Sequence, residues 1–264
     1  AYELKQLKAI EVWKDKKPGI LSESFDLMVL PLTWAASLIV PVKLVESALT
    51  AVSNVSKQLT LENDILAKAG VEKIEELLSL DLEISDSLAE DCLQRSTAYA
   101  GTSGAALGAT GVGGIPLDIG TLLTIAFNTI HKIALCYGYQ KLDEQFVFAV
   151  LAAANADNRA DRIKTIEVIQ QLQTVIEDEV IEEQMKGMVI SKVVRAGCYF
   201  SARGVAKGIG KNLARRKVLQ IVPLVGAVFG GVGNVVFISD VSIAARHLFQ
   251  QRWLIDNGRI ENLS

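Results

Sequence analysis

The sequence contains few of the residues that mark secreted, β-rich or metal-dependent proteins. Among 264 residues there are two histidines and three cysteines, and the cysteines lie far apart, at Cys92, Cys136 and Cys198. Because this number and spacing give no disulfide framework, we predict reduced, buried thiols of a cytosolic protein. Prolines number only five and tryptophans three, while Ala, Ile, Leu and Val are abundant. This composition disfavours a β-sandwich or barrel and predicts an all-α fold.

Motifs of known reactions are also missing. The sequence has no GxSxG and therefore no hydrolase nucleophile elbow. The candidate polar residues are Asp118, His131 and Asp240, because a buried carboxylate beside the uncharged, glycine-rich stretches could act as a base. Helix capping by the two acids and a hydrogen-bonded core position for His131 are the simpler interpretations. We predict no catalytic residue, no metal and no cofactor.

Acidic residues are absent from a stretch that makes up about one fifth of the chain. The 56 residues between Glu183 and Asp240 hold none of the 30 acidic residues but nine of the 27 basic ones. The basic residues are Lys186, Lys192, Arg195, Arg203, Lys207, Lys211, Arg215, Arg216 and Lys217. They are followed by 22 uncharged residues, 218–239. A cationic helix before a glycine-rich apolar segment is typical of a protein that meets an anionic membrane surface.

Six of these basic residues form the predicted membrane-contact set: Arg203, Lys207, Lys211, Arg215, Arg216 and Lys217. The first four recur every four residues, so they form one cationic stripe on a helix. An alternative is that the stripe pairs with the acidic helix predicted over residues 163–194. A nucleic-acid interface is a further alternative, which the lack of interleaved aromatic residues and the acidity of the remaining chain disfavour.

Glycines four residues apart occur three times, at Gly104/Gly108, Gly204/Gly208 and Gly226/Gly230. Residues at this spacing share a helix face, so each pair lets a neighbouring helix approach closely. We predict that these glycines mediate helix packing, either at a membrane or inside a compact soluble bundle.

Composition and periodicity divide the chain into three segments. An amphipathic helix and a linker form residues 1–26, a helical domain follows over 27–254, and a tail forms 255–264. The domain begins with an apolar segment, 27–42, that contains two prolines. It is shorter than the roughly 20 residues that span a bilayer, so we predict a buried or interfacial segment.

Two stretches of the domain carry specific boundary predictions. Asp118 is expected to cap a helix over residues 119–135, which ends near Gly138, a residue suited to a left-handed cap. Near the C-terminus we expect an apolar stretch over 218–239 and then a separate helix over 240–254.

Two blocks of the sequence resemble the EcsC protein family. The first is Gly113-Gly114-Ile115-Pro116-Leu117-Asp118 with the later Tyr137-Gly138, and the second is Ile221 to Ala227 with Gly230, Gly231 and Asn234. The resemblance covers roughly residues 40–254. It implies a bacterial, membrane-associated helical protein from a family named for a gene beside an ABC transporter. It transfers no catalytic residue, and the matching residues are expected to be structural.

Together these observations predict a single all-α multi-helix bundle with glycine-rich, closely packed central helices. We expect a non-enzymatic cytoplasmic protein that is peripheral to the inner membrane, contacts anionic lipid and supports a membrane transporter. The first alternative is a lipid- or fatty-acid-binding protein with an internal apolar cavity. The second is a hydrolase that uses two of the candidate polar residues in such a cavity. No nucleic-acid partner is expected.

Overall fold

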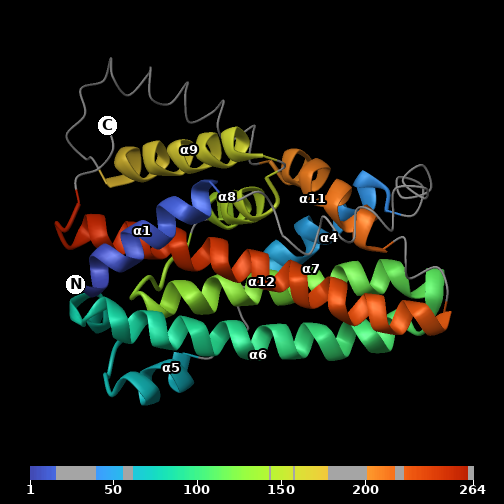
Figure 1. Cartoon of the computed structure of the whole chain (residues 1–264), viewed down its shortest axis with the longest axis horizontal. Helices are drawn as coiled ribbons and strands as arrows, with labels where there is room; N and C mark the ends of the chain where they lie inside the picture. Colours follow the sequence, from blue (N-terminus) through green and yellow to red (C-terminus); the bar gives the residue numbers. More distant parts are fainter. Residues whose placement is uncertain are drawn as a thin grey trace.

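Three long helices form the centre of the molecule. The computed structural model describes residues 1–15, 40–55, 62–142, 144–156, 158–177, 201–217 and 223–260, and these residues contain helices and no strand. The central helices, which lie side by side in Figure 1, are α6 (Leu82–Gly108), α7 (Ile115–Cys136) and α12 (Pro223–Asp256). The predicted all-α bundle is therefore confirmed.

Helices α6 and α12 run antiparallel and share the largest helix–helix contact. Arg246 binds Glu90 (3.0 Å) in one part of this contact, and Gly104 lies against Gly230 in another. The backbones approach closely there, because a Cβ on Gly104 would lie 2.5 Å from the carbonyl oxygen of Gly230. The two uncharged, glycine-rich stretches of the sequence thus pack on each other.

Helix α7 returns beside α6 after a short connection. The 3-10 helix η4 (Gly111–Gly114) makes the reversal, and Gly111 has a positive φ of 65°. At the other end of α7, Gly138 has a φ of +88°, which confirms the predicted left-handed position. Most of the α7 side chains are apolar and buried, including Ile119, Leu122 and Ile130, each 0% exposed. Helix α7 is therefore a core element.

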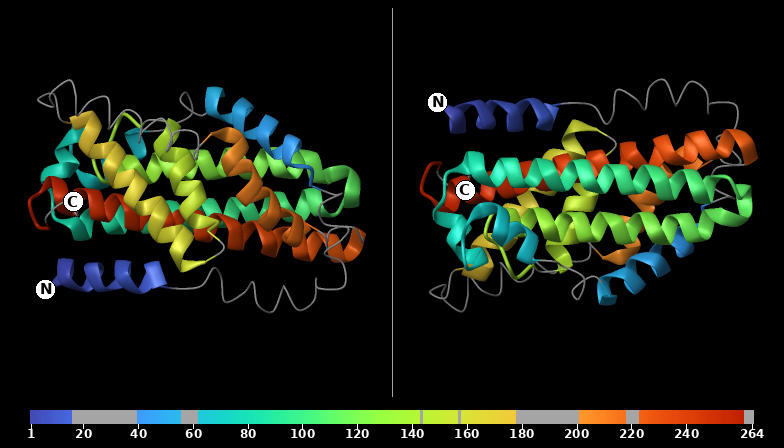
Figure 2. Two further views of the ribbon diagram at one scale, coloured as in Figure 1. Left: turned by 90° about the horizontal axis from the view of Figure 1, so that it is seen from above. Right: turned by 90° about the horizontal axis from the view of Figure 1, so that it is seen from below.

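The shorter helices surround this core (Figures 1 and 2). Helices α1 (Tyr2–Asp15) and α8 (Glu144–Ala154) contact α12, and α9 (Arg159–Glu177) packs on both α1 and α8. Helices α4 (Val42–Val55) and α11 (Ala202–Lys217) pack on each other, and α4 also contacts α7. Helix α5 (Glu62–Ala69) and the 3-10 helix η3 (Ile74–Ser79) lie next to α7.

Two predicted boundaries are wrong. Asp118 does not cap its helix, because α7 already begins at Ile115 and Asp118 lies in its first turn. No separate helix begins at residue 240, because α12 is continuous from Pro223 to Asp256. Gly230 and Gly231 of the apolar stretch stay helical there, since they pack on α6, and Gly233 lies against Arg216 of α11. The predicted segment 27–42 lies almost entirely outside the described residues, as do residues 178–200 of the acid-free region.

Candidate functional site

The exposed face of α11 carries three of the predicted membrane-contact residues: Arg203, Lys207 and Lys211. The opposite face is apolar and packs into the bundle through Val205, Ile209 and Leu213, each 4% exposed or less. The four-residue spacing produces this division, because residues four apart share one helix face. The side chain of Arg215 lies outside the described part of the structure. Helix α11 itself carries no acidic residue, so its outer face is cationic.

The last two residues of α11, Arg216 and Lys217, do not belong to this exposed face. The predicted membrane-contact set is corrected accordingly. Arg216 binds Asp240 of α12 (3.0 Å), and its guanidinium lies 5.6 Å from the ring centre of Phe237. Lys217 is only 1% exposed, so its side chain does not reach the protein surface. Its assignment to the membrane-contact set is wrong for this fold, since its ammonium is enclosed by protein.

Lys217 belongs to a buried polar cluster that joins three helices. Its ammonium donates to a carboxylate oxygen of Asp118 in α7 and to the Oδ1 of Asn234 in α12 (2.6 Å). The amide nitrogen of Asn234 donates to the other carboxylate oxygen of Asp118 (2.8 Å). All three side chains are 1% exposed or less. We call these residues the Asp118–Lys217–Asn234 cluster.

The electrostatics of this cluster are those of a compensated ion pair. Burial lowers the pKa of Lys217, and the adjacent Asp118 carboxylate opposes this shift. Both carboxylate oxygens accept hydrogen bonds, so the cluster holds its helices together and offers no exposed nucleophile. Gly104 covers it closely, because a Cβ there would collide with the Asn234 amide.

The glycine pairs differ in what surrounds them. Gly104 and Gly108 are buried in α6, and Gly104 contacts Gly230 of α12. In contrast, Gly204 and Gly208 lie on the exposed face of α11, and a Cβ on Gly208 would have no neighbour within 4 Å. The surroundings of Gly226 lie outside the described residues. Within the described part, the first pair therefore packs closely between α6 and α12, whereas Gly204 and Gly208 of α11 are exposed.

The three candidate polar residues do not assemble into one site. Asp118 binds Lys217, Asp240 binds Arg216, and the His131 ring bonds to the carbonyl oxygen of Phe127 (2.8 Å). Asp118 and His131 are also 13 residues apart on one helix, which corresponds to about 20 Å. The hydrolase alternative required two of these three residues within hydrogen-bond reach of each other. Instead, each of the three binds a different residue.

A second buried cluster, centred on Asp86 of α6, was missed by the sequence analysis. Its carboxylate accepts hydrogen bonds from Tyr137, from Tyr2 (2.7 Å) and from Gln250 (2.7 Å). Burial, followed by the negative charge of Asp86, raises the pKa of Tyr137 well above its ordinary value. The sequence did contain a signal for this cluster: Asp86 lies at helical spacing from Leu82 and Ala89, which are both buried, so it falls on the buried side of α6.

His247 lies beside this cluster. Its Nδ1 is 2.8 Å from Oε1 of Gln250, and its ring lies 5.2 Å from that of Trp13. Burial lowers the pKa of His247 to about 4, although the hydrogen bond with Gln250 opposes the shift. The imidazole is therefore neutral at physiological pH, and it is partly buried between Trp13 and Gln250.

Two of the cysteines are neighbours in space. The sulfur atoms of Cys92 in α6 and Cys136 in α7 are 3.7 Å apart, and both are free thiols. Cys136 is buried as predicted, while Cys92 is only partly buried, and Cys198 lies outside the described residues. The hydrogen bond with Cys92, together with burial, raises the pKa of Cys136.

Two helices of the described part are long and apolar enough to cross a membrane. They are Ile115–Cys136 and Ala227–Asp256, with mean hydropathies of 1.4 and 1.6 in their most apolar windows. Of these windows, 67% and 50% of the residues are buried inside the protein. The core helices of soluble proteins have the same length and composition, so this property alone is weak support for a span.

Comparison with known proteins decides the family. The model of the EcsC protein family matches residues 4–254. The chain belongs to the EcsC protein family. It is also similar to the uncharacterized protein YdbA of Bacillus subtilis (strain 168), with 26% identity over 191 residues. The match covers 70% of this chain and 64% of YdbA, which is less than two thirds of that relative. No solved structure matches the chain.

The residues that carried the EcsC resemblance have structural positions in this chain. Asp118 and Asn234 hold Lys217 in the buried cluster, and Tyr137 donates to Asp86. Gly138 takes a positive φ that other residues rarely adopt. The EcsC motifs thus fix contacts among α6, α7, α11 and α12.

Proposed function

We propose that this EcsC protein is a non-enzymatic, cytoplasmic protein that docks peripherally on an anionic membrane through the exposed face of α11. The observation that carries the proposal is the outward position of Arg203, Lys207 and Lys211, one helical turn apart on a helix without acids. Near an anionic surface each basic residue contributes about 1 kcal/mol. Three such residues support a weak, salt-sensitive attachment.

Two further features of this region support the proposal. Gly204 and Gly208 lie on the same exposed face, so lipid phosphates could approach the α11 backbone closely. The neighbouring helix α12 exposes two valines one turn apart, Val228 (64%) and Val232 (41%). Exposed apolar side chains suit shallow burial in the headgroup region.

Flotation with lipid vesicles tests the proposal. Vesicles containing phosphatidylglycerol and vesicles of pure phosphatidylcholine are compared at low and high salt. We expect binding only to the anionic vesicles, with loss at high salt and in the variant Arg203→Gln/Lys207→Gln/Lys211→Gln.

A matched control removes three positive charges elsewhere on the surface. Lys5, Lys8 and Lys73 are exposed, and their replacement by Gln changes the net charge by the same amount. The control should bind as the wild type does. Equal loss of binding in both triple variants would show that only net charge matters. No binding of the wild-type protein to the anionic vesicles would reject membrane docking.

The other expectations stay predictions. Support of a membrane transporter and an internal cavity for a fatty acid are tested by co-purification from membranes and by native mass spectrometry, respectively. The hydrolase alternative is the weakest, since Asp118, His131 and Asp240 each have separate partners.

A further inference from the structure

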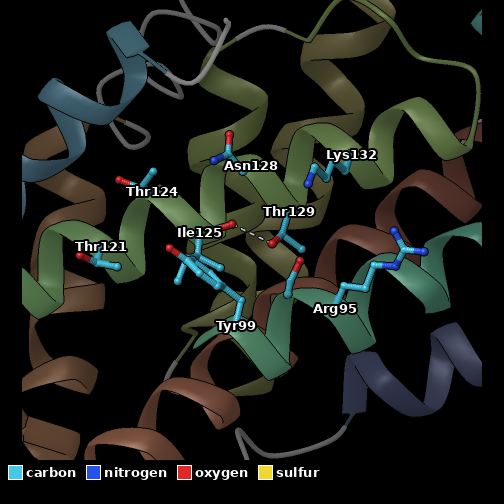
Figure 3. A pocket seen from close by; sticks show the side chains of 9 residues that line it. Arg95, Tyr99, Thr121, Thr124, Ile125, Asn128, Thr129 and Lys132 are labelled. Atoms are coloured by element: carbon cyan, nitrogen blue, oxygen red, sulfur yellow. Dashed lines mark hydrogen bonds between the residues drawn. The ribbon is translucent and has the colours of Figure 1, made fainter. Parts of the chain in front are cut away.

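A pocket of about 550 Å³ lies between α6 and α7 (Figure 3). Arg95, Ser96 and Tyr99 of α6 form one wall, and Thr121, Asn128 and Lys132 of α7 contribute to the other. The spacing explains the pocket, because residues three, four or seven apart lie on one face of each helix. No acidic residue is among the described residues that line it.

Some of the polar groups that line this pocket have no protein partner among the described residues, although Thr124 donates to the carbonyl of Gly120 (2.8 Å). The Oδ1 of Asn128 is buried without a hydrogen bond within the described structure. The hydroxyl groups of Ser96, Tyr99 and Thr121 likewise have no bonding partner among the described residues. By contrast, the hydroxyl of Thr129, also in the lining, donates to the carbonyl of Ile125 (2.7 Å). The Asn128 oxygen can serve a ligand, because a buried polar atom normally finds a partner. The three hydroxyl groups are half-buried or exposed, with Tyr99 61% exposed, so a ligand in the pocket can reach them.

The charge of the pocket is positive. Lys132 has no carboxylate within ion-pair distance in the part of the chain that the structure describes. Arg95 binds Asp64 (2.7 Å), but the two side chains are 63% and 57% exposed. Such a surface pair is weak, so an anion can replace or share it. An arginine, a lysine and several hydroxyl donors form the usual surroundings of a phosphate group.

We propose that this pocket binds a phosphate ester of a polyol. Arg95 and Lys132 hold the phosphate, while Ser96, Thr121 and the unpaired Asn128 oxygen bind the hydroxyl groups of the ligand. Tyr99 forms an apolar wall beside them. The same chemistry occurs in a free polyol phosphate and in the headgroup of a phosphatidylglycerol. The site lies on a different pair of helices from the α11 docking face, so it goes beyond the proposed function.

Isothermal titration calorimetry of the full chain tests this site with three soluble probes. These are inorganic phosphate, glycerol 3-phosphate and dihexanoyl-phosphatidylglycerol below its micelle concentration, where no membrane surface exists. We expect glycerol 3-phosphate to bind more tightly than inorganic phosphate, because only the former has hydroxyl groups. Tighter binding of the short-chain lipid identifies a headgroup as the ligand, whereas equal or weaker binding identifies a free polyol phosphate.

Variants assign the binding to the pocket. Arg95→Gln/Lys132→Gln should weaken glycerol 3-phosphate binding by about tenfold or more, through the loss of two charged donors. The isosteric Asn128→Asp places a negative charge in the pocket and should abolish binding. Lys5→Gln/Lys8→Gln, with the same charge change as the first variant, should bind normally. Circular dichroism verifies that each variant is folded.

Three results would overturn the proposal. These are no binding of any probe, unchanged affinity in both pocket variants, and equal affinity for inorganic phosphate and glycerol 3-phosphate. Failure of vesicle flotation alone would reject docking by α11 and leave this site unaffected, because the calorimetric probes need no membrane.

Discussion

Removing one charge from the Asp118–Lys217–Asn234 cluster tests how the bundle is held together. Asp118→Asn keeps the shape of the side chain but removes the negative charge that faces the Lys217 ammonium. Lys217 is 1% exposed, so the ammonium cannot reach water unless the end of α11 moves. The folded variant must either keep an uncompensated charge or release the lysine proton.

Proton release sets the upper limit of the cost. An ordinary lysine has a pKa of about 10.4, so its deprotonation at pH 7 costs about 4.6 kcal/mol. Removing one partner of a buried ion pair typically costs about 3–5 kcal/mol. We therefore expect Asp118→Asn to lower the free energy of unfolding by about 3–4 kcal/mol. Lys217→Met should cost a similar amount, because it leaves the Asp118 carboxylate buried without its counter-charge.

Urea unfolding followed by circular dichroism measures these costs. With an m-value of about 3 kcal/mol/M, each single variant should lower the midpoint by about 1 M. The double variant Asp118→Asn/Lys217→Met removes both charges and should cost less than either single change, because a neutral buried site is tolerated better.

The pH dependence of Asp118→Asn supplies a second measurement. Burial lowers the pKa of Lys217, so the unfolded chain binds more protons than the folded one between the two pKa values. The stability of the variant should therefore rise with pH toward 10. Single costs below about 1 kcal/mol, together with an additive double variant, would refute a buried pair in solution.

Two smaller predictions concern packing and acid stability. Gly104→Ala should destabilise the protein by about 2 kcal/mol, because its Cβ would lie 2.5 Å from the Gly230 oxygen. Gly208→Ala, whose Cβ has no neighbour within 4 Å, should instead stabilise it by up to ~1 kcal/mol, and urea unfolding of both checks the contrast. Lowering the pH from 7 to 4 should cost about 3 kcal/mol through His247, since its pKa falls from 6.5 to about 4 and the unfolded state takes up the proton first. His247→Gln should lose this part of the pH dependence in acid titrations of stability, and an unchanged slope would contradict a buried neutral imidazole.

Local signals predicted much of the fold. The amphipathic helix predicted within residues 1–26 is observed as Tyr2–Asp15, and Gly138 has the expected backbone conformation. The continuity of α12 was not predicted, because glycine in a helix costs about 1 kcal/mol relative to alanine. Packing against α6 offsets that cost, and such tertiary contacts are not visible in a local sequence window.

The sites were less predictable, because their members come from separate helices. Asp86 and Tyr137 are 51 residues apart, and Asp118 and Lys217 are 99 apart. The pocket between α6 and α7 depends on the separation of two helices, which periodicity does not reveal. Charge alone was also misleading, since the cations of the predicted contact set carry the same sign, but the described ones differ in burial.

Helical phase separates the cations better than charge does. Lys217 lies four residues after Leu213, in the same row as Val205 and Ile209, whereas Arg203, Lys207 and Lys211 occupy another row. Its position in the apolar row predicts burial, and burial requires a counter-charge, which Asp118 supplies from an equally apolar face of α7. The predicted membrane-contact set had six cations. The proposed docking face contains three described ones, Arg203, Lys207 and Lys211. At about 1 kcal/mol each, these cations would contribute about 3 kcal/mol to the proposed membrane binding. On this proposal, about 3 kcal/mol suffices for reversible attachment in low salt, and permanent attachment would need a further apolar contact, for which Val228 and Val232 are exposed.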